Sequence, residues 1–232
     1  MKALVFIPTY NEKDNIENLI GEILKLGLEL RILVVDDASS DGTAGILDKI
    51  ARSDPRVEVM HRKGKRGRGL AGREGFKCAL TQGVDYIIEM DADFSHHPRY
   101  IPQFLEEIKD CDVVIGSRWI EGGSVSGRPW ERDYFSGLAQ FFCRFILGLR
   151  VLDATSGYRC FRKKVLESLG LENFLSEGPE IVEEINYHVQ KEGFKVKEIP
   201  IVFYERHSGA SKLNIKKILH TFYTLIRMRL SR

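Results

Sequence analysis

The chain has 232 residues, of which 43% are hydrophobic and 29% charged, and it carries a formal net charge of +2. This length and balance predict one globular domain with a substantial core, and a charge so near zero argues against a nucleic-acid partner. No uninterrupted apolar stretch approaches the roughly 20 residues that span a bilayer, so we expect no transmembrane segment. The four cysteines are widely spaced and suit reduced thiols in a cytosolic compartment.

The first half of the chain alternates short β-rich runs with amphipathic helical ones. Strands are predicted over residues 2–7, 31–35, 57–60, 85–90 and 112–116, and helices over 15–26, 42–51, 70–81 and 100–109. The alternation predicts an α/β fold with a mostly parallel central sheet and helices on both faces. Ligands of such sheets bind beyond the carboxyl ends of the strands, so the residues that follow each strand are candidates for a site.

The second half is less regular. A glycine-rich loop over 121–127 leads to a predicted aromatic helix over 134–147. Further helices are predicted over 179–192 and 215–229, and two strand-like runs lie between them, over 195–199 and 201–204. No internal repeat, low-complexity tract or linker marks a domain boundary, so a single domain is predicted.

Polar residues follow the first two predicted strands. Pro8-Thr-Tyr-Asn-Glu12 comes after the first, and Asp36-Asp-Ala-Ser-Ser-Asp-Gly42 after the second. These carboxylates can accept hydrogen bonds from a nucleobase or a ribose, while Ser40 or Asp41 can cap the next helix. Capping explains one of the polar residues and leaves the pair of aspartates as candidate ligand contacts.

The predicted strand over 85–90 ends in Asp91-Ala-Asp93-Phe-Ser95. The two carboxylates lie on the same side of an extended backbone, which is costly unless a positive charge lies between them. A cation that prefers oxygen ligands, Mg²⁺ or Mn²⁺, fits this role, and Ser95 can add a ligand directly or through water. The simpler alternative is an acidic turn that caps the helix beginning near Pro98.

A basic segment follows the third predicted strand. Gly67-Arg-Gly-Leu-Ala-Gly72, within this segment, matches the dinucleotide fingerprint G-x-G-x-x-G, but that fingerprint belongs after the first strand. We interpret it as a flexible cationic loop that approaches a phosphate-bearing ligand, with dinucleotide binding as the alternative. The cations of the segment are Arg62, Lys63, Lys65, Arg66, Arg68 and Arg73.

Taken in order, several strings in the chain form a signature. They are IPTYNE, VVDDASSDGT, MDADFSHHP, VIGSRW, the GG loop with Arg132, DATSGYR, SEG and RHSGASKL. The signature resembles the family 2 inverting glycosyltransferases of the GT-A (nucleotide-diphospho-sugar transferase) fold, and among them the dolichol-phosphate (polyprenol-phosphate) mannosyltransferases. Each string alone is weak, but their order and spacing extend over nearly the whole chain.

The resemblance implies a single GT-A domain over 1–232, with a nucleotide-binding half over about 1–118 and an acceptor-binding half over about 119–232. It implies GDP-mannose as the donor, a dolichyl or polyprenyl monophosphate as the acceptor, transfer with inversion, and Mg²⁺ or Mn²⁺ as the cofactor. The alternatives are a polyprenyl-phosphate glucosyltransferase that uses UDP-glucose, and a non-catalytic nucleotide-binding membrane scaffold.

The resemblance also implies roles for individual residues. The metal would be held by Asp91, Asp93 and Ser95, and the acceptor phosphate would face Arg118, Arg132 and Ser136. Catalytic roles would fall to Asp93, Arg118, Arg132 and Arg206. The nucleotide sugar would be bound by Pro8, Tyr10, Glu12, Val35, Asp37, Asp91 and Lys212.

Two strings depart from the pattern that the resemblance implies. Family members often carry Gly-Leu-Gly-Thr-Ala where this chain has Gly67-Arg-Gly-Leu-Ala71, and the SEG string continues with Pro179-Glu-Ile181 in place of aromatic residues. Both departures bear on sugar and acceptor selectivity.

An isoprenoid acceptor implies a peripheral position on the cytoplasmic face of a membrane. Either the aromatic helix or the terminal helix would supply the contact with the membrane. The aromatic helix would use Phe135, Leu138, Phe141, Phe142, Phe145, Ile146 and Leu149, and the terminal helix would use Phe222, Leu225 and Ile226. Core burial is the alternative for both helices. A small membrane-anchoring subunit is a further way to hold the chain at the membrane.

Overall fold

The computed structural model describes residues 2–127, 130–205 and 215–230, without the side chains of 130–133, 135 and 215–220. Within this part of the chain, one seven-stranded sheet has the order β3-β2-β1-β4-β7-β5-β8. Six of its strands run parallel to one another, and β7 alone is antiparallel, to β4 and to β5. The strands are β1 (Ala3–Thr9), β2 (Leu30–Asp36), β3 (Val57–His61), β4 (Tyr86–Glu89), β5 (Val113–Ser117), β7 (Arg159–Arg162) and β8 (Val196–Pro200).

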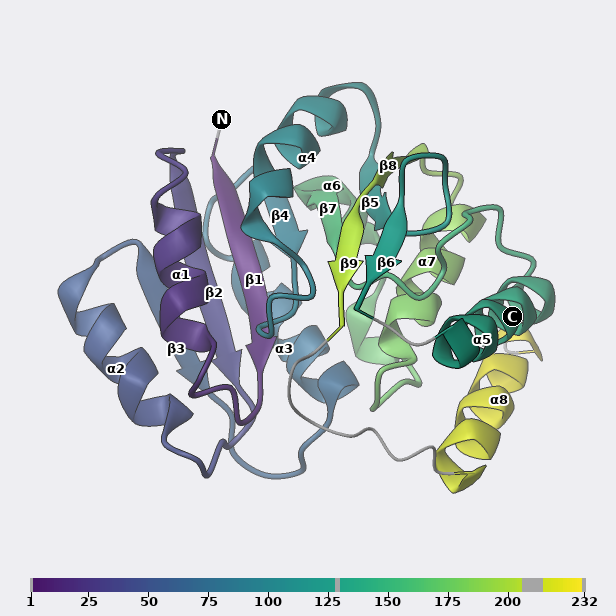
Figure 1. Ribbon diagram of the computed structural model, residues 1–232, viewed down its shortest axis with the longest axis horizontal. Helices are drawn as coiled ribbons and strands as arrows, with labels where there is room; N and C mark the ends of the chain where they lie inside the picture. The colour runs from purple at the N-terminus through teal and green to yellow at the C-terminus, as the bar shows by residue number, and fades with distance from the viewer. Residues whose placement is uncertain (1, 128–129, 206–214, 231–232) are drawn as a thin grey trace.

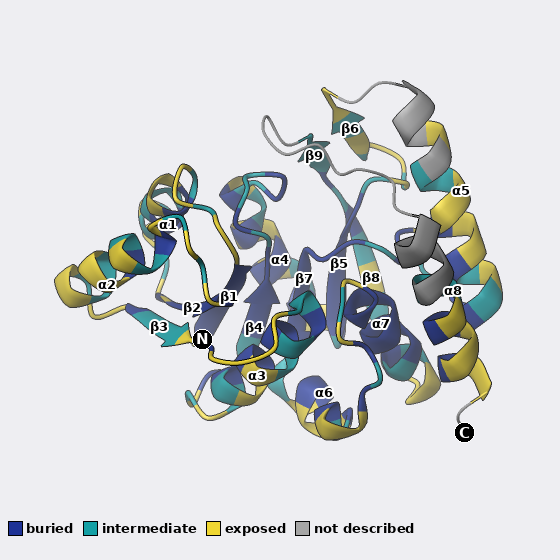
Figure 2. Ribbon diagram, turned by 90° about the horizontal axis from the view of Figure 1, so that it is seen from below, coloured by how far each residue is buried: buried dark blue, intermediate teal, exposed yellow. Residues whose placement is uncertain are grey.

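Helices cover both faces of this sheet (Figure 2). One face is covered by α1 (Ile16–Leu24), α2 (Thr43–Ser53) and α4 (Ile101–Glu107), and the other by α3 (Arg68–Leu80), α6 (Lys163–Ser168) and α7 (Ile181–Lys191). Single 3₁₀ turns occur at Pro98–Tyr100, Ile108–Asp110 and Leu171–Asn173. The observed architecture confirms the predicted α/β fold with a mostly parallel sheet between helical layers.

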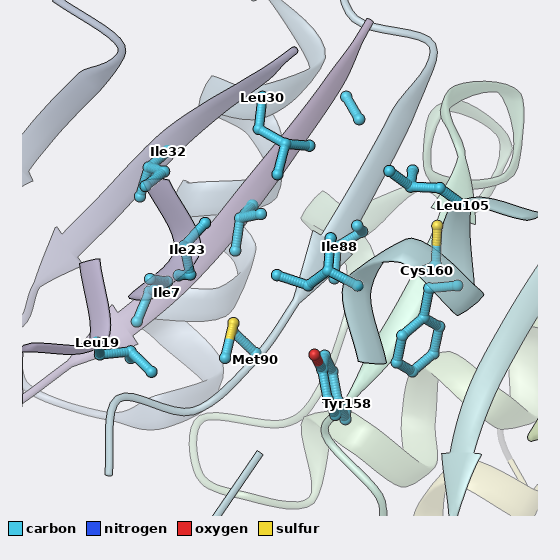
Figure 3. Packing of buried hydrophobic residues seen from close by; sticks show 14 of the residues in the cluster. Ile7, Leu19, Ile23, Leu30, Ile32, Ile88, Met90, Leu105, Tyr158 and Cys160 are labelled. Atoms are coloured by element: carbon cyan, nitrogen blue, oxygen red, sulfur yellow. The ribbon is translucent and has the colours of Figure 1, made fainter. Parts of the chain in front are cut away.

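The strands divide their side chains between two cores because successive residues of a strand point to opposite faces. In β1, Val5 and Ile7 join the core under α1, α2 and α4, whereas Leu4 and Phe6 join the core under α3, α6 and α7. Figure 3 shows the first of these cores, in which Leu19 of α1 lies close to the strands. Because both faces are buried, the central strands are nearly continuous apolar runs, as expected for parallel sheets.

Two further elements flank the sheet (Figure 1). A short parallel ribbon pairs β6 (Ser124–Ser126) with β9 (Val202–Tyr204). Helices α5 (Trp130–Leu147) and α8 (Ile215–Leu230) pack side by side at one end of the molecule. They share a third core with α7, which includes Leu147 and Leu225.

The predicted elements are found within a few residues of their expected bounds, with three omissions. Three elements were not predicted from the sequence, β6, β7 and α6, and each of them is six residues or shorter. One interpretation was wrong: residues 68–72 begin α3 and do not form a flexible loop. In the described residues, no helix combines the length and the apolar character that a membrane span requires.

Candidate active site

A cavity of about 360 Å³ opens where β1, β2 and β4 end. These three strands are adjacent and parallel, so the loops at their carboxyl ends meet at one edge of the sheet. Five of the residues expected to bind the nucleotide sugar, Pro8, Tyr10, Glu12, Asp37 and Asp91, line this cavity together. The remaining lining residues are Thr9, Arg66, Gly67, Arg68, Ala71 and Ala92.

The backbone at this edge is held in an unusual conformation. Outside glycine, the described residues with positive φ are Asn11, Ala38 and Phe94, at 56°, 59° and 62°. Each lies in the loop after one of the three converging strands. Asparagine adopts this left-handed conformation more readily than other residues, but it is costly for alanine and phenylalanine and tends to persist at functional sites, where surrounding contacts impose it.

Basic side chains enclose the side of the cavity formed by the first two loops. Asp37 is 7% exposed, and its carboxylate accepts hydrogen bonds from the Arg62 guanidinium and from the backbone N–H of Gly67, the latter at 2.8 Å. The Arg66 guanidinium donates to the Tyr10 hydroxyl and lies 4.9 Å from the centre of its ring. The basic segment therefore folds over the expected nucleoside site.

Val35 lies elsewhere. Its side chain is fully buried in the core under α3, and it is not among the residues that line the cavity.

The loop after β4 presents the two aspartates expected at the metal. The Asp91 side chain is 24% exposed, and its backbone N–H donates to His96 Nδ1 at 3.0 Å. Asp93 Oδ1 accepts hydrogen bonds from the Ser95 hydroxyl at 2.5 Å and from the Ser95 backbone N–H at 3.1 Å. Burial lowers the pKa of His96, so its ring is neutral at pH 7 and accepts at Nδ1.

The carboxylate oxygens of Asp91 and Asp93 are suitable ligands for a cation such as Mg²⁺ or Mn²⁺. Both ions prefer oxygen ligands, and Mg²⁺ is commonly bound by one or two carboxylates together with substrate phosphates. Within the described ranges, no three His, Cys, Asp or Glu side chains gather into a set that could hold an ion. Asp91, which lines the cavity, and Asp93, two residues further along the same loop, match the pattern in which a nucleotide diphosphate supplies the other ligands.

A row of alternating charges runs inward from Asp91. Arg68 donates to Asp91 Oδ1 at 2.9 Å and to Glu89 Oε1 at 3.0 Å. The other oxygen of Glu89 accepts from Arg159, which is fully buried and also donates to the Val182 carbonyl. Desolvation lowers the pKa of Arg68, but the Asp91 and Glu89 carboxylates outweigh it and raise the pKa overall, so Arg68 stays charged.

Arg118 lies at the end of β5 and is tied to the loop before β7. Its Nε and Nη2 donate to the two oxygens of Asp153 at 2.8 and 2.6 Å, and Nη2 also reaches the Thr155 hydroxyl at 2.6 Å. The guanidinium lies 5.2 Å from the ring centre of Phe203 in β9. Phe203 in turn packs edge-on against His96, so this arginine borders the loop that is expected to hold the metal.

The expected acceptor residues are only partly described. Ser136 is half-buried on α5, one residue before Gly137, and a Cβ added to Gly137 would lie 3.6 Å from the Trp119 side chain. The segment after β5 therefore reaches the first half of α5. Of the other residues expected here, the side chain of Arg132 and the whole of Arg206 and Lys212 lie outside the described residues.

The two strings that depart from the family pattern lie against each other. The backbone N–H of Gly69 donates to the Glu177 carbonyl at 2.9 Å. A Cβ on Gly69 would lie 2.6 Å from the Ser176 carbonyl oxygen, so only glycine allows this approach. The start of α3 and the SEG string thus form one unit beside the cavity.

Several residues at this site had no individual role predicted from the sequence. Glu89 is buried and accepts a hydrogen bond from Arg68, and the buried Arg159 neutralises Glu89 from its other side. Asp153 holds Arg118, and Arg66, expected only as one cation of the basic segment, lines the cavity. Two features of the sequence pointed to these residues: the cluster of cations over 62–73, and the arginine in the Gly67–Ala71 string, which differs from the family pattern. What they contact is fixed by tertiary structure.

Comparison with known proteins adds a family and close relatives. The family model described as "Glycosyl transferase family 2" matches residues 4–170. The chain is 40% identical over 237 residues to a polyprenol monophosphomannose synthase of Mycolicibacterium smegmatis, covering 100% of this chain and 89% of the relative. It is 39% identical over 214 residues to an undecaprenyl-phosphate mannosyltransferase of Micrococcus luteus, covering 92% and 88%.

A solved structure supports the fold. The chain resembles a mannosyltransferase of Pyrobaculum calidifontis in complex with GDP-Man and Mn²⁺, with a TM-score of 0.61 and 19% identity. The match covers 90% of this chain and 58% of that one. At this identity the likeness shows the shared fold.

Proposed function

The chain belongs to glycosyl transferase family 2, and on that basis we propose that it transfers mannose from GDP-mannose to a polyprenyl monophosphate such as dolichyl phosphate, with inversion. The two relatives near 40% identity, whose names include polyprenol monophosphomannose synthase and undecaprenyl-phosphate mannosyltransferase, support the sugar and the acceptor class. The Pyrobaculum structure, which contains GDP-Man and Mn²⁺, supports the donor and the metal.

The observation that carries the proposal is the cavity itself. It brings Tyr10, Glu12 and Asp37, which suit a nucleoside, within one space that also contains Asp91. A nucleotide seated against the first two loops would direct its diphosphate toward the third loop. When bound there by Asp91 and Asp93, a divalent cation would neutralise the diphosphate and stabilise it as a leaving group.

The acceptor makes a dedicated general base unnecessary. A phosphate monoester is anionic at neutral pH, so one of its oxygens can attack the anomeric carbon directly. The new C–O bond forms on the face opposite the diphosphate, while the old C–O bond breaks and its electron pair leaves with GDP. The protein's task is to position two anionic groups and offset their repulsion. We assign this task to Arg118, Arg132 and Arg206, with Lys212 on the donor.

A lipid-bearing acceptor requires contact with a membrane, and the structure offers a surface for it. We define the apolar helix face as the exposed apolar side chains Tyr134, Leu138, Phe141, Phe142 and Phe145 of α5 and Tyr223, Ile226 and Leu230 of α8. Phe145 and Leu230 are each 76% exposed. Where the side chains of the two helices are described, exposed residues mark their outward sides (Figure 2).

Packing decides which of the expected membrane residues belong to this face. Phe142 meets Phe222 with ring centres 5.9 Å apart, which joins the two helices. Leu149 and Leu225 are instead buried in the core shared with α7, so the expectation that they contact the membrane was wrong. Arg144 in the last turn of α5 and Arg227 in the last turn of α8 are cations that could contact anionic headgroups at the rim of this face.

The function is tested by transfer of radiolabelled sugar into the organic phase. Purified protein, Mn²⁺ and a short polyprenyl phosphate are incubated with either GDP-mannose or UDP-glucose. We expect label to enter the lipid from GDP-mannose. Label from UDP-glucose alone would favour the glucosyltransferase alternative, and no label from either, together with intact GDP binding, would favour the scaffold.

The membrane contact is tested separately by flotation with vesicles that contain anionic lipid. We expect the wild-type protein to float at low salt and the double variant Phe141→Ser, Phe145→Ser to remain in the soluble fraction. Equal flotation of the two proteins would show that the apolar helix face is not the contact, and would leave an anchoring subunit as the alternative.

A further inference from the structure

Arg68 was expected only as one cation of a segment that approaches a phosphate, but in the structure it contacts two carboxylates. It is the first residue of α3, lines the cavity, and has a side chain that is 23% exposed. Its guanidinium spans Glu89, which is fully buried, and Asp91, which faces the expected metal.

The fold builds a slot for this guanidinium. A Cβ added to Gly157 would lie 2.9 Å from Arg68 Nη2, so a side chain there would collide with it. The backbone of α3 is held at the same place, because the next residue, Gly69, donates to the Glu177 carbonyl. The start of α3 is therefore held by its backbone, and the tip of the Arg68 side chain lies directly against Gly157.

Glu89 does not need Arg68 to neutralise its negative charge. Glu89 already has a buried partner in Arg159, which donates to Oε2 at 3.1 and 2.5 Å. The second guanidinium brings the group of Glu89, Asp91, Asp93, Arg68 and Arg159 to a single net negative charge. A bare divalent ion would turn this group positive, whereas an ion that arrives with a diphosphate would not.

We infer that Arg68 is a positioning residue that makes cation capture depend on the nucleotide. Its guanidinium holds the Asp91 carboxylate in place, and its charge opposes a bare divalent ion. The site therefore accepts the ion together with the nucleoside diphosphate. This inference rests on the proposed function, because it takes Asp91 and Asp93 as the metal ligands.

The test is a titration of the protein with Mn²⁺, followed by the electron paramagnetic resonance signal of the free ion, with and without GDP. Arg68→Gln removes the charge and keeps a hydrogen-bond donor, whereas Arg68→Lys keeps the charge. Arg73→Gln is the matched control, since Arg73 lies on the same helix and donates to the Phe174 carbonyl.

Without GDP, we expect Arg68→Gln to bind Mn²⁺ at least about tenfold more tightly than wild type, because a nearby positive charge has been removed. Arg68→Lys and Arg73→Gln should stay within about twofold of wild type. GDP should strengthen Mn²⁺ binding strongly in wild type and much less in Arg68→Gln.

An unchanged or weaker affinity in Arg68→Gln, or equal affinities in the Gln and Lys variants, would overturn the inference and assign Arg68 a structural role only. If Arg68→Gln fails to fold, Gly157→Ala replaces it: we expect the displaced guanidinium to give tighter Mn²⁺ binding, and no change would again overturn the inference. Failure of wild type to bind Mn²⁺ even with GDP would instead count against the proposed metal site.

Discussion

Arg118 and Asp153 form a bidentate ion pair that joins the end of β5 to the loop before β7. The same carboxylate also accepts the backbone N–H of Arg118 at 2.9 Å, so both the chain and the side chain of this arginine are fixed. The Arg118 side chain is 10% exposed and the Asp153 side chain is fully buried. A charge that is expected to face the acceptor phosphate is thus pre-oriented before any ligand binds.

Asp153→Asn should destabilise the protein, because it leaves the buried Arg118 guanidinium without its counter-charge. We expect the free energy of unfolding to fall by about 3 kcal/mol. Urea denaturation measures this free energy. The control is Lys163→Ala, which breaks the ion pair with Glu167 and should change the free energy of unfolding by less than about 0.5 kcal/mol. Equal small effects of both variants would show that the Arg118–Asp153 pair is not structurally important.

Arg132→Ala should lower turnover without preventing folding. Arg132 lies in the first turn of α5 and is assigned to charge stabilisation, so its loss should reduce kcat by about two orders of magnitude. The transfer assay measures this, and Arg52→Ala, an exposed position on α2, is the control. A near-normal kcat in Arg132→Ala would reject its catalytic role.

Glu183 should make the protein less stable as the pH rises. Burial raises its pKa to about 7, and its Oε2 has no hydrogen-bond partner among the described residues. The folded protein therefore holds a proton that the unfolded chain releases above its ordinary pKa of 4.5. The stability that this proton provides is complete below pH 4.5 and is lost as the pH rises through about 7.

The variant Glu183→Gln tests this titration. It should raise the free energy of unfolding by about 2 kcal/mol at pH 8 and change it little at pH 5. Urea denaturation across this range measures both values. If the variant changed the free energy of unfolding by the same amount at every pH, Glu183 would not titrate in the folded protein.

Gly69→Ala and Gly45→Ala should have opposite effects, although both glycines lie in helices. A Cβ on Gly69 would collide with the backbone of the SEG string, 2.7 Å from Glu177 C, whereas a Cβ on Gly45 meets nothing within 4 Å. We expect Gly69→Ala to lower the free energy of unfolding by about 2 kcal/mol and Gly45→Ala to raise it by about 0.5–1 kcal/mol. Thermal unfolding provides the comparison, and a stabilised Gly69→Ala would contradict the tight packing described here.

Sequence patterns predicted the parts of the site that depend on local structure. The polar residues after β1, β2 and β4 were recognised because the ends of parallel strands meet at one edge. The antiparallel β7 was missed because it has four residues and an arginine at each end. Those arginines are acceptable there because Arg159 is neutralised by Glu89, and Arg162 donates to the carbonyls of Cys111 and Lys109, contacts that only the folded chain brings together.

The exposed face of α8 and the role of Arg68 also depend on contacts that only the folded chain brings together. The amphipathic pattern of α8 is compatible with either side facing solvent, and only its packing against α5 and α7 buries Leu225 while leaving Ile226 exposed. Arg68 is 21 and 23 residues from its two carboxylate partners, so its role cannot be deduced from spacing.

The central claim is that the aspartates at the end of β4 bind the cation that stabilises the departing nucleotide. Its most direct test is the rate of mannose transfer to polyprenyl phosphate in Asp91→Asn and Asp93→Asn, with Asp110→Asn, an exposed position, as the control. We predict that each of the first two variants loses at least about a hundredfold in rate, while Asp110→Asn retains wild-type activity. Unchanged sugar transfer in both Asp91→Asn and Asp93→Asn would contradict the claim.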